Sequence, residues 1–392
     1  MINFDPNPFE AELLAETARQ ATVYRRYARE FDRPQDHDLN GSVTMPVPEE
    51  AEFLHVRNLL RQRIDETSGY DLMEALIYLE ECKGAKPFYP RPVDADAFDT
   101  NLSKFLLKAV GTPEQYEKWG DGYGFLSWGM TEPGAGSDPS SMRMTAVRDS
   151  ATGDWVLNGE KIFISQVQEA AGIVTMARVP EEGPHSIGLF VVEKDRPGFT
   201  LGRQFKKLGI RNRDLASFAL DDYRIPDVNR LRGSLKDALN EFNGTRSLIA
   251  AEALGLISAA LDITRGALEE AGVEIDYTAS AARSTAAADR FIDLEAEYEA
   301  GYMTLLHTRW LHQTQGRDKV RTAMAKVAAA GGARRIIREC MDILGPNSTS
   351  KDYFLEQAMR DSRITDIYEG PGEVLRLLIA RDMLGYSARE LN

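Results

Sequence analysis

The sequence is poor in cysteine: its 392 residues include only Cys82 and Cys340. Two cysteines so far apart form neither a disulfide framework nor the paired spacing of a zinc site, so no metal site is expected. Disulfides are rare in reducing compartments, and the scarcity of cysteine therefore favours a cytoplasmic protein. The first nine residues also lack the basic and apolar regions that are typical of a secretory signal.

Positive charge is also in short supply, since 47 Lys and Arg against 61 Asp and Glu leave a net charge of −14. That balance repels nucleic acid and anionic membrane surfaces, so neither is expected as a partner. The only long apolar stretch, around residues 248–261, contains Glu252 and is shorter than the roughly 20 residues of a membrane-spanning helix. We therefore expect no membrane span, and an anionic substrate would have to be bound by local donors.

The hydrophobic pattern divides the chain into three parts. Over residues 1–120, apolar residues recur three and four positions apart, which predicts amphipathic helices. Residues 121–228 carry short β-branched and aromatic runs, which predict strands near 155–157, 161–165, 173–176, 187–192 and 218–223, with Asn158-Gly159 as the turn of a hairpin. Residues 229–392 return to the helical period, with an alanine-rich face at 323–330 that allows close helix packing.

Three segments contain residues suited to chemistry. The turn from Trp128 to Asp138 offers hydroxyls, glycines and free amides that can hold a phosphate or a flavin edge, although Gly-Ser-Asp clusters are also ordinary turns. Glu369 lies in a breaker-rich joint between two helices, where an apolar cavity would raise the pKa of its carboxyl and prepare it to accept a proton; a solvated loop is the alternative. Arg246, at the head of an apolar helix, suits either an anionic group or a surface cap.

Taken in order, a series of motifs resembles the acyl-CoA dehydrogenase family. They are Thr131-Glu-Pro-Gly-Ala-Gly-Ser-Asp138, Leu157-Asn-Gly-Glu-Lys-Ile-Phe-Ile-Ser165, Lys207-Leu-Gly-Ile-Arg211, Asp221-Asp-Tyr-Arg-Ile-Pro226, Thr245-Arg246, Arg360-Asp361, Ile367-Tyr-Glu-Gly370 and Ala380-Arg381. The resemblance is clear from about residue 100 to 392 and extends to the N-terminal helices by pattern alone.

The resemblance implies a mixed fold with an α-helical N-terminal domain, a central β-domain of barrel or sandwich type, and a C-terminal four-helix bundle. It further implies that FAD and an acyl thioester lie between these domains. The reaction it implies is oxidation of acyl-CoA to trans-2-enoyl-CoA, with an electron-transferring flavoprotein as acceptor and a dimer or tetramer as the assembly. Acyl chain length, branching and the carrier, CoA or a carrier protein, are not predicted.

The resemblance also assigns roles to individual positions. Glu369 matches the base that removes the α-proton while the β-hydrogen leaves as hydride to flavin N5. In some relatives the base instead precedes the bundle arginine, a position that Thr245 holds here. The cofactor contacts implied are Trp128, Met130, Thr131, Gly136, Ser137, Phe163 and Ser165. The substrate contacts implied are Ser137, Asn243, Arg246, Tyr368, Gly370 and Arg381.

The sequence departs from the family pattern where a neighbouring subunit completes the FAD site. Residues 271–277 lack the family's Arg and Phe-Gly, and residues 342–346 read Asp-Ile-Leu-Gly-Pro instead of Gln-x-x-Gly-Gly. Separately, Pro371 follows the Glu369-Gly370 pair where the family has a threonine. One alternative is therefore a non-catalytic subunit of a hetero-oligomer. Others are an oxidase, a hydroxylase, or a dehydrogenase of carrier-bound acyl groups. Within a homo-oligomer, the nearest replacements for the missing contacts are Tyr277, Arg283 and Asn347.

Overall fold

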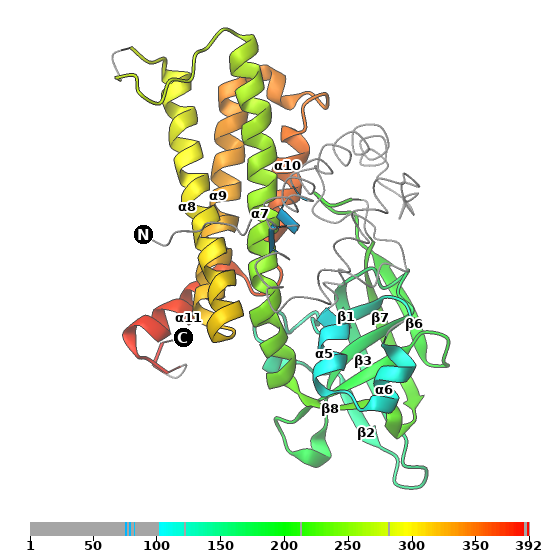
Figure 1. Cartoon of the computed structure of the whole chain (residues 1–392). Coiled ribbons are helices and arrows are strands. Elements are labelled where there is room, and N and C mark those ends of the chain that lie inside the picture. Colours follow the sequence, from blue (N-terminus) through cyan, green and yellow to red (C-terminus); the bar gives the residue numbers. More distant parts are fainter. Residues whose placement is uncertain are drawn as a thin grey trace.

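The computed structural model describes residues 75, 76, 78, 79, 82, 102–120, 123–211, 214–280, 283–387 and 390–391. Most of the predicted N-terminal helical domain therefore lies outside the described residues. Figure 1 shows the described chain as two bodies side by side, a sheet and a bundle of long helices, with α7 passing from one to the other.

Two helices precede the sheet: α5 (Leu102–Val110) and α6 (Pro113–Trp119). Thr112 and Gln115 form a reciprocal capping box at the start of α6, which satisfies two otherwise unpaired backbone N–H groups. The Gln115 amide also donates to the carbonyls of Val228 and Arg230 at 2.8 and 2.7 Å. This single side chain therefore fixes both the start of the helix and its place against the sheet.

Eight strands form one sheet in the order β6-β7-β3-β2-β4-β5-β8, with β1 parallel to β4. Their bounds are β1 (Leu126–Gly129), β2 (Thr145–Arg148), β3 (Trp155–Ser165), β4 (Gly172–Arg178), β5 (Ile187–Glu193), β6 (Phe199–Gln204), β7 (Leu215–Ile225) and β8 (Arg230–Ser234). The single turns η3 (Pro139–Ser141), η4 (Pro180–Glu182) and η5 (Asp227–Asn229) lie between them. The predicted strands are confirmed.

The predicted hairpin at Asn158-Gly159 is wrong, because both residues lie inside the continuous strand β3. Gly159 has φ 145° at a shift in the register with β7, and a Cβ there would come within 2.8 Å of Met144. Glycine is therefore required here by an irregularity in the strand and by the closeness of Met144. Besides turns, such irregularities are the places where an isolated glycine is common.

The helices after the sheet are α7 (Leu235–Glu270), α8 (Ala286–Gln315), α9 (Lys319–Leu344), α10 (Leu355–Ser362) and α11 (Gly372–Leu384), with the turns η6 (Gly345–Thr349) and η7 (Arg363–Asp366). Ala323, Ala325, Ala329 and Ala330 are buried, as the alanine-rich pattern predicts. By length and composition α7 could cross a membrane, but 89% of its most apolar 18-residue window is buried inside the protein. Its apolar surface therefore serves as the core of the bundle.

Candidate active site

Glu369 lies in the turn between η7 and α11, and its carboxyl points to α7. The carboxyl oxygen Oε2 accepts a hydrogen bond from Thr245 Oγ1 at 2.8 Å. Burial has the largest effect and raises the pKa of the Glu369 carboxyl, while Thr245, Lys326 and Arg246 act in the opposite direction. A carboxyl with a raised pKa is a better proton acceptor near neutral pH than an ordinary one. The structure thus places Glu369 in a half-buried, hydrogen-bonded setting and not in the solvated loop that the sequence left open.

Two cations hold the backbone of this turn. Arg246 Nε donates to the carbonyl oxygen of Glu369 at 2.8 Å, and Arg246 Nη1 donates to Asn243 Oδ1 at 3.0 Å. Lys326 Nζ, from α9, donates to the carbonyl oxygen of Gly370 at 2.6 Å and to that of Tyr368. Arg246 and Lys326 are both buried, and burial lowers the pKa of Lys326 to about 8.

Tyr368 connects the turn to a second carboxyl on α7. Its hydroxyl donates to Glu252 Oε2 at 2.5 Å, and the hydroxyl of Tyr78 lies 3.5 Å from the same oxygen. Glu252 is fully buried, and burial raises the pKa of its carboxyl to about 8. Helix α7 therefore faces residues 368–369 with Thr245, Arg246 and Glu252.

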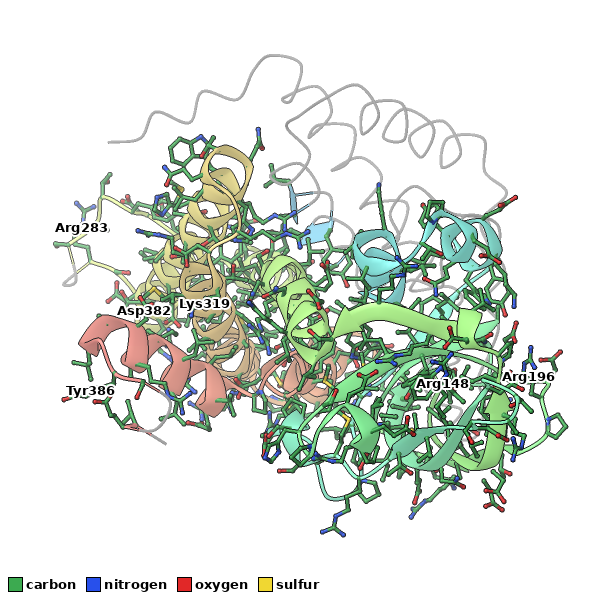
Figure 2. All side chains as sticks on the ribbon, turned by 90° about the horizontal axis from the view of Figure 1, so that it is seen from below. Arg148, Arg196, Arg283, Lys319, Asp382 and Tyr386 are labelled. Atoms are coloured by element: carbon green, nitrogen blue, oxygen red, sulfur yellow. The ribbon has the colours of Figure 1, made fainter. Side chains whose placement is uncertain are left out.

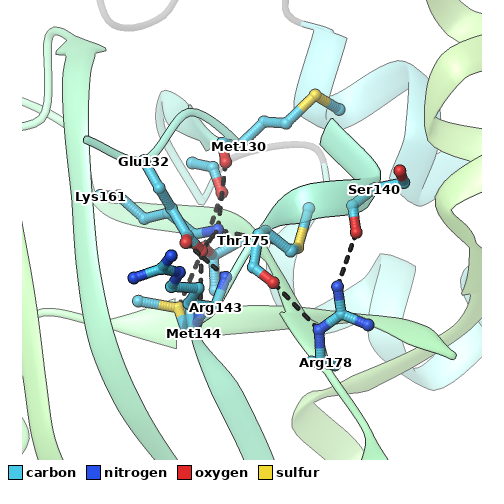
Figure 3. A network of polar contacts seen from close by, with 10 residues as sticks. Met130, Glu132, Ser140, Arg143, Met144, Lys161, Thr175 and Arg178 are labelled. Carbon is cyan, nitrogen blue, oxygen red and sulfur yellow. Dashed lines mark hydrogen bonds and ion pairs between the residues drawn. The ribbon is translucent and has the colours of Figure 1, made fainter. Parts of the chain in front are cut away.

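On the sheet side, a buried ion pair shapes the turn that carries Thr131. Lys161 Nζ lies 2.8 Å from Glu132 Oε1 and donates to the Met130 carbonyl at 3.1 Å (Figure 3). The Glu132 carboxylate also accepts hydrogen bonds from the backbone N–H groups of Arg143 and Met144 at 2.5 and 3.0 Å. A buried charge is tolerated when it is paired and hydrogen-bonded on all sides, as here. These contacts hold residues 130–132 rigidly beside β3.

The residues next to this pair suit a planar, hydrogen-bonding cofactor. The backbone N–H of Ile162 donates to the Thr131 carbonyl at 2.9 Å, which brings Thr131 beside Phe163. The Phe163 ring packs on Phe205, is 55% exposed, and stands on a left-handed backbone with φ 57°. The buried Trp128 indole N–H has no hydrogen-bond partner among the described residues. An exposed ring and an unpartnered buried donor are groups that a flavin ring can use.

Comparisons with known proteins show to which family the chain belongs. The family models for the middle and C-terminal domains of acyl-CoA dehydrogenases match residues 127–223 and 235–384. An acyl-CoA dehydrogenase of Bacillus subtilis is 33% identical over 297 residues, which are 73% of this chain and 76% of that protein. The chain belongs to the acyl-CoA dehydrogenase family. It is accordingly an FAD-dependent oxidoreductase that acts on the CH–CH bond of acyl-CoA.

Solved structures show the same fold. The butyryl-CoA dehydrogenase of Megasphaera elsdenii has a TM-score of 0.78 at 24% identity, over 98% of this chain and 100% of that chain. A chain from work on the electron transferring flavoprotein of Acidaminococcus fermentans has a TM-score of 0.76 at 25% identity, over 98% of this chain and 100% of that chain. The predicted fold, a β-domain followed by a helical bundle, is thereby confirmed.

Two motifs of this acyl-CoA dehydrogenase join the sheet to the bundle. The Ile210 N–H donates to Asp361 Oδ1 at 2.6 Å, and Arg360 Nη1 donates to the Leu208 carbonyl at 3.1 Å. Gly209 lies so close to α10 that a Cβ there would be 2.4 Å from the Arg360 carbonyl oxygen. Residues 208–210 and 360–361 therefore form a docking contact between the sheet and the bundle.

The structure brings together some of the sequence-predicted site residues and leaves others apart. Asn243, Arg246, Tyr368, Glu369 and Gly370 form one connected network, as described above. Ser165 lies on the sheet side, where its carbonyl accepts a hydrogen bond from Ser127 at 2.9 Å. Gly136 has Thr131 as its near neighbour, with Cγ2 3.9 Å from a built Cβ, and Ser137 beside it is exposed. Arg381 instead donates to the Leu391 carbonyl at 2.6 Å, near the chain end.

Sequence reasoning missed Lys326, Glu252 and the Glu132–Lys161 pair as parts of the site. A signal existed for the first two, because each is a charged residue inside an apolar helical run. Such a residue is rarely buried without a partner. The partner of Lys326 is main chain, however, and main-chain partners leave no mark in a sequence. Among the described residues, no group of three or more His, Cys, Asp and Glu side chains could hold a metal ion.

The altered segments lie at one end of the bundle, where α7 ends and η6 begins (Figure 1). The Tyr277 ring is 62% exposed, and its hydroxyl donates to Glu295 at 2.7 Å and accepts from Arg265. Arg283 and Asn347 are exposed as well. In Figure 2, Arg283 stands on the bundle side, away from Arg148 and Arg196 on the sheet side. These three residues are available at the surface, as a contact to an adenosine group would require.

Proposed function

We propose that Glu369 is the base of the acyl-CoA dehydrogenation. The observation that carries this proposal is the Glu369 carboxyl, raised in pKa by burial and oriented by the 2.8 Å hydrogen bond from Thr245. Thr245 occupies the alternative position for the base, and a threonine hydroxyl cannot accept the proton at neutral pH. Instead it holds Glu369 in place. The α-proton of the thioester moves to a carboxylate oxygen of Glu369 as the α-carbon develops negative charge.

The other residues bind and orient the cofactor and the acyl thioester, and polarise the thioester carbonyl. Bound FAD supplies a hydride acceptor at N5. Trp128, Met130, Thr131, Gly136, Ser137, Phe163 and Ser165 are the residues that we propose hold it, with Phe163 against the ring face. The backbone N–H of Glu369 donates to the thioester carbonyl oxygen, and such preorganised donors are worth several kcal/mol at a developing oxyanion. Asn243, Arg246, Tyr368, Gly370, Ser137 and Arg381 are the proposed substrate contacts.

The test replaces the base by its neutral isostere. Purified protein with Glu369→Gln should keep its yellow flavin, because the carboxyl is not among the proposed cofactor contacts. It should lose reduction of the flavin by acyl-CoA, seen as bleaching, by a factor of about 10³ or more, since general-base catalysis alone contributes about 10²–10⁴-fold. Glu373→Gln, at an exposed carboxyl four residues further on, is the matched control and should bleach normally. An equally active Glu369→Gln protein would refute the assignment.

We further propose an electron-transferring flavoprotein as the acceptor, supported by the likeness to the chain from the Acidaminococcus fermentans work. The reduced protein should then transfer electrons rapidly to such a flavoprotein and react slowly with oxygen. Fast reoxidation by oxygen would favour an oxidase or hydroxylase instead. A panel of straight and branched acyl groups, each on CoA and on a carrier protein, identifies the substrate within the acyl thioester class.

The division into residues 1–120, 121–228 and 229–392 is proposed as three functional parts, with the flavin ring between the second and the third. Contacts such as Ile210 to Asp361 support it, because they hold the sheet against the bundle. A non-catalytic subunit has no use for a Glu369 whose carboxyl is oriented by Thr245 and whose pKa is raised.

A further inference from the structure

Lys326 is a buried lysine whose hydrogen bonds go to main chain instead of to a carboxylate. It lies on α9 with 1% of its surface exposed. Its ammonium donates to the carbonyls of Tyr368 and Gly370, the two residues that flank Glu369. Taking an ammonium out of water is costly unless it is fully hydrogen-bonded. The Lys326 ammonium and this turn therefore hold each other in place.

Together with Arg246, the lysine fixes three successive carbonyl groups. Arg246 binds the carbonyl of Glu369 at 2.8 Å, between the two that Lys326 binds. This matters because Glu369 and Gly370 have φ values of 52° and 96°. A left-handed backbone is unfavourable for a glutamate and persists only where surrounding contacts determine it. Two cations from two different helices, α7 and α9, provide those contacts.

The charged groups around the Lys326 ammonium define its electrostatic effect. The carboxyls of Glu369, Asp366 and Glu252 face it, and so does the Arg246 guanidinium. The lysine charge lowers the pKa of Glu369, opposing the upward effect of burial. At neutral pH more of Glu369 is therefore in the carboxylate form, which can accept a proton.

We propose that Lys326 is a positioning residue for the base: it clamps the backbone on both sides of Glu369 and so sets where the carboxylate meets the α-carbon. This inference rests on the proposed function of Glu369. The inference gives Lys326 of α9 a part in the reaction, although the Lys326 side chain does not touch the reacting atoms. Misplacing a catalytic group by about 1 Å can cost about 100-fold in rate.

The test measures proton abstraction directly. The flavin-containing protein is incubated without oxygen in D₂O with an acyl-CoA, and mass spectrometry follows exchange of the α-hydrogens. Lys326→Met removes donor and charge; we expect exchange to slow at least about tenfold at neutral pH, with the KM for acyl-CoA within about twofold. The acid limb of the pH profile should move to higher pH, because the lysine charge no longer lowers the pKa of Glu369. Lys319→Met, at an exposed lysine at the start of α9, should behave as wild type.

Lys326→Gln separates the two effects of the lysine. Glutamine can still donate to the turn but carries no charge, so its exchange rate should recover part of the loss while the pH profile stays shifted. Flavin content and circular dichroism report whether the Lys326→Met protein folds. If it folds poorly, Lys326→Gln serves as the test variant. Wild-type exchange and an unchanged pH profile in either Lys326 variant would overturn the proposal, as would glutamine and methionine proteins that are equally slow with no shift. Normal exchange in Glu369→Gln would instead overturn the base itself.

Discussion

Glu252 is the residue whose proton uptake most clearly couples to folding. Burial raises the pKa of its carboxyl to about 8, and the nearby charges of Glu369 and Asp361 add to this effect. An unfolded glutamate titrates near its ordinary value, far below 8. Between these two values the folded protein binds a proton that the unfolded chain has already lost. The contribution of Glu252 to stability is therefore fully present at acid pH and is lost as the pH rises to about 8.

We accordingly predict that Glu252→Gln reduces the decline of stability between pH 5 and pH 7.5. Glutamine keeps the shape of the protonated carboxyl but does not titrate, so up to about 1.4 kcal/mol per pH unit of the wild-type slope should vanish. The buried lysines, Lys161 and Lys326, titrate near pH 8 and above and leave this window largely unaffected. Thermal melts of both proteins across the window give the answer. Parallel Tm curves would show that Glu252 is ionised in the folded protein.

At the scale of elements, the contact between residues 208–210 and α10 holds the sheet on the bundle. Gly209→Ala would place a Cβ 2.4 Å from the Arg360 carbonyl oxygen and 2.5 Å from its carbon. Backbone atoms cannot move aside like a flexible side chain, so the segment must lift from α10. We predict a loss of about 1–3 kcal/mol, the usual cost of overpacking, seen as a lower Tm and faster proteolysis around residue 210.

Gly266→Ala is the matched control for this prediction. Gly266 lies in α7, and apart from its chain neighbours and the helix's own backbone no atom lies within 4 Å of a Cβ built there. Alanine is preferred over glycine inside a helix by about 1 kcal/mol, so this variant should be as stable as wild type or slightly more so. A Gly209→Ala protein that melts with the control would show that the docking contact is dispensable.

The helices and strands also show how much of the structure can be predicted from the sequence. Strands such as β4 and β5 were predicted because β-branched and aromatic runs fit a packed sheet, and α7 because its apolar residues follow the helical period. The Asn158-Gly159 hairpin failed because a turn dipeptide and a strand irregularity need the same backbone freedom. Lys326 was missed because its partners are carbonyl groups brought close by three-dimensional packing. The motif around Glu369 indicates a base, but the hydrogen bond that Glu369 accepts from Thr245 is visible only in the folded structure.

At the scale of the whole molecule, the sheet side and the bundle side contribute unequally to the proposed cofactor site. The ring half, around Thr131 and Phe163, is built within this chain from contacts described above. The adenosine half, which in the family's pattern is completed by a neighbouring subunit, has lost its Arg, Phe-Gly and Gln. A protein in this position either pairs with a related chain that supplies these residues or holds the adenosine by other contacts of its own oligomer.

We favour the homo-oligomer, because Tyr277, Arg283 and Asn347 offer an exposed ring, a cation and an amide at one end of the bundle. Expressed alone, the chain should then form a dimer or tetramer with about one FAD per chain, measured by light scattering and flavin absorbance. Arg283→Glu should weaken FAD retention at least about tenfold, since it replaces a proposed donor to the adenosine half of FAD with a charge that repels the adjoining phosphates. Lys319→Glu, an equal charge change at an exposed lysine, should retain FAD. A flavin-free monomer that gains FAD only when co-expressed with a related chain would reverse this preference, because the missing contacts would then come from a different subunit.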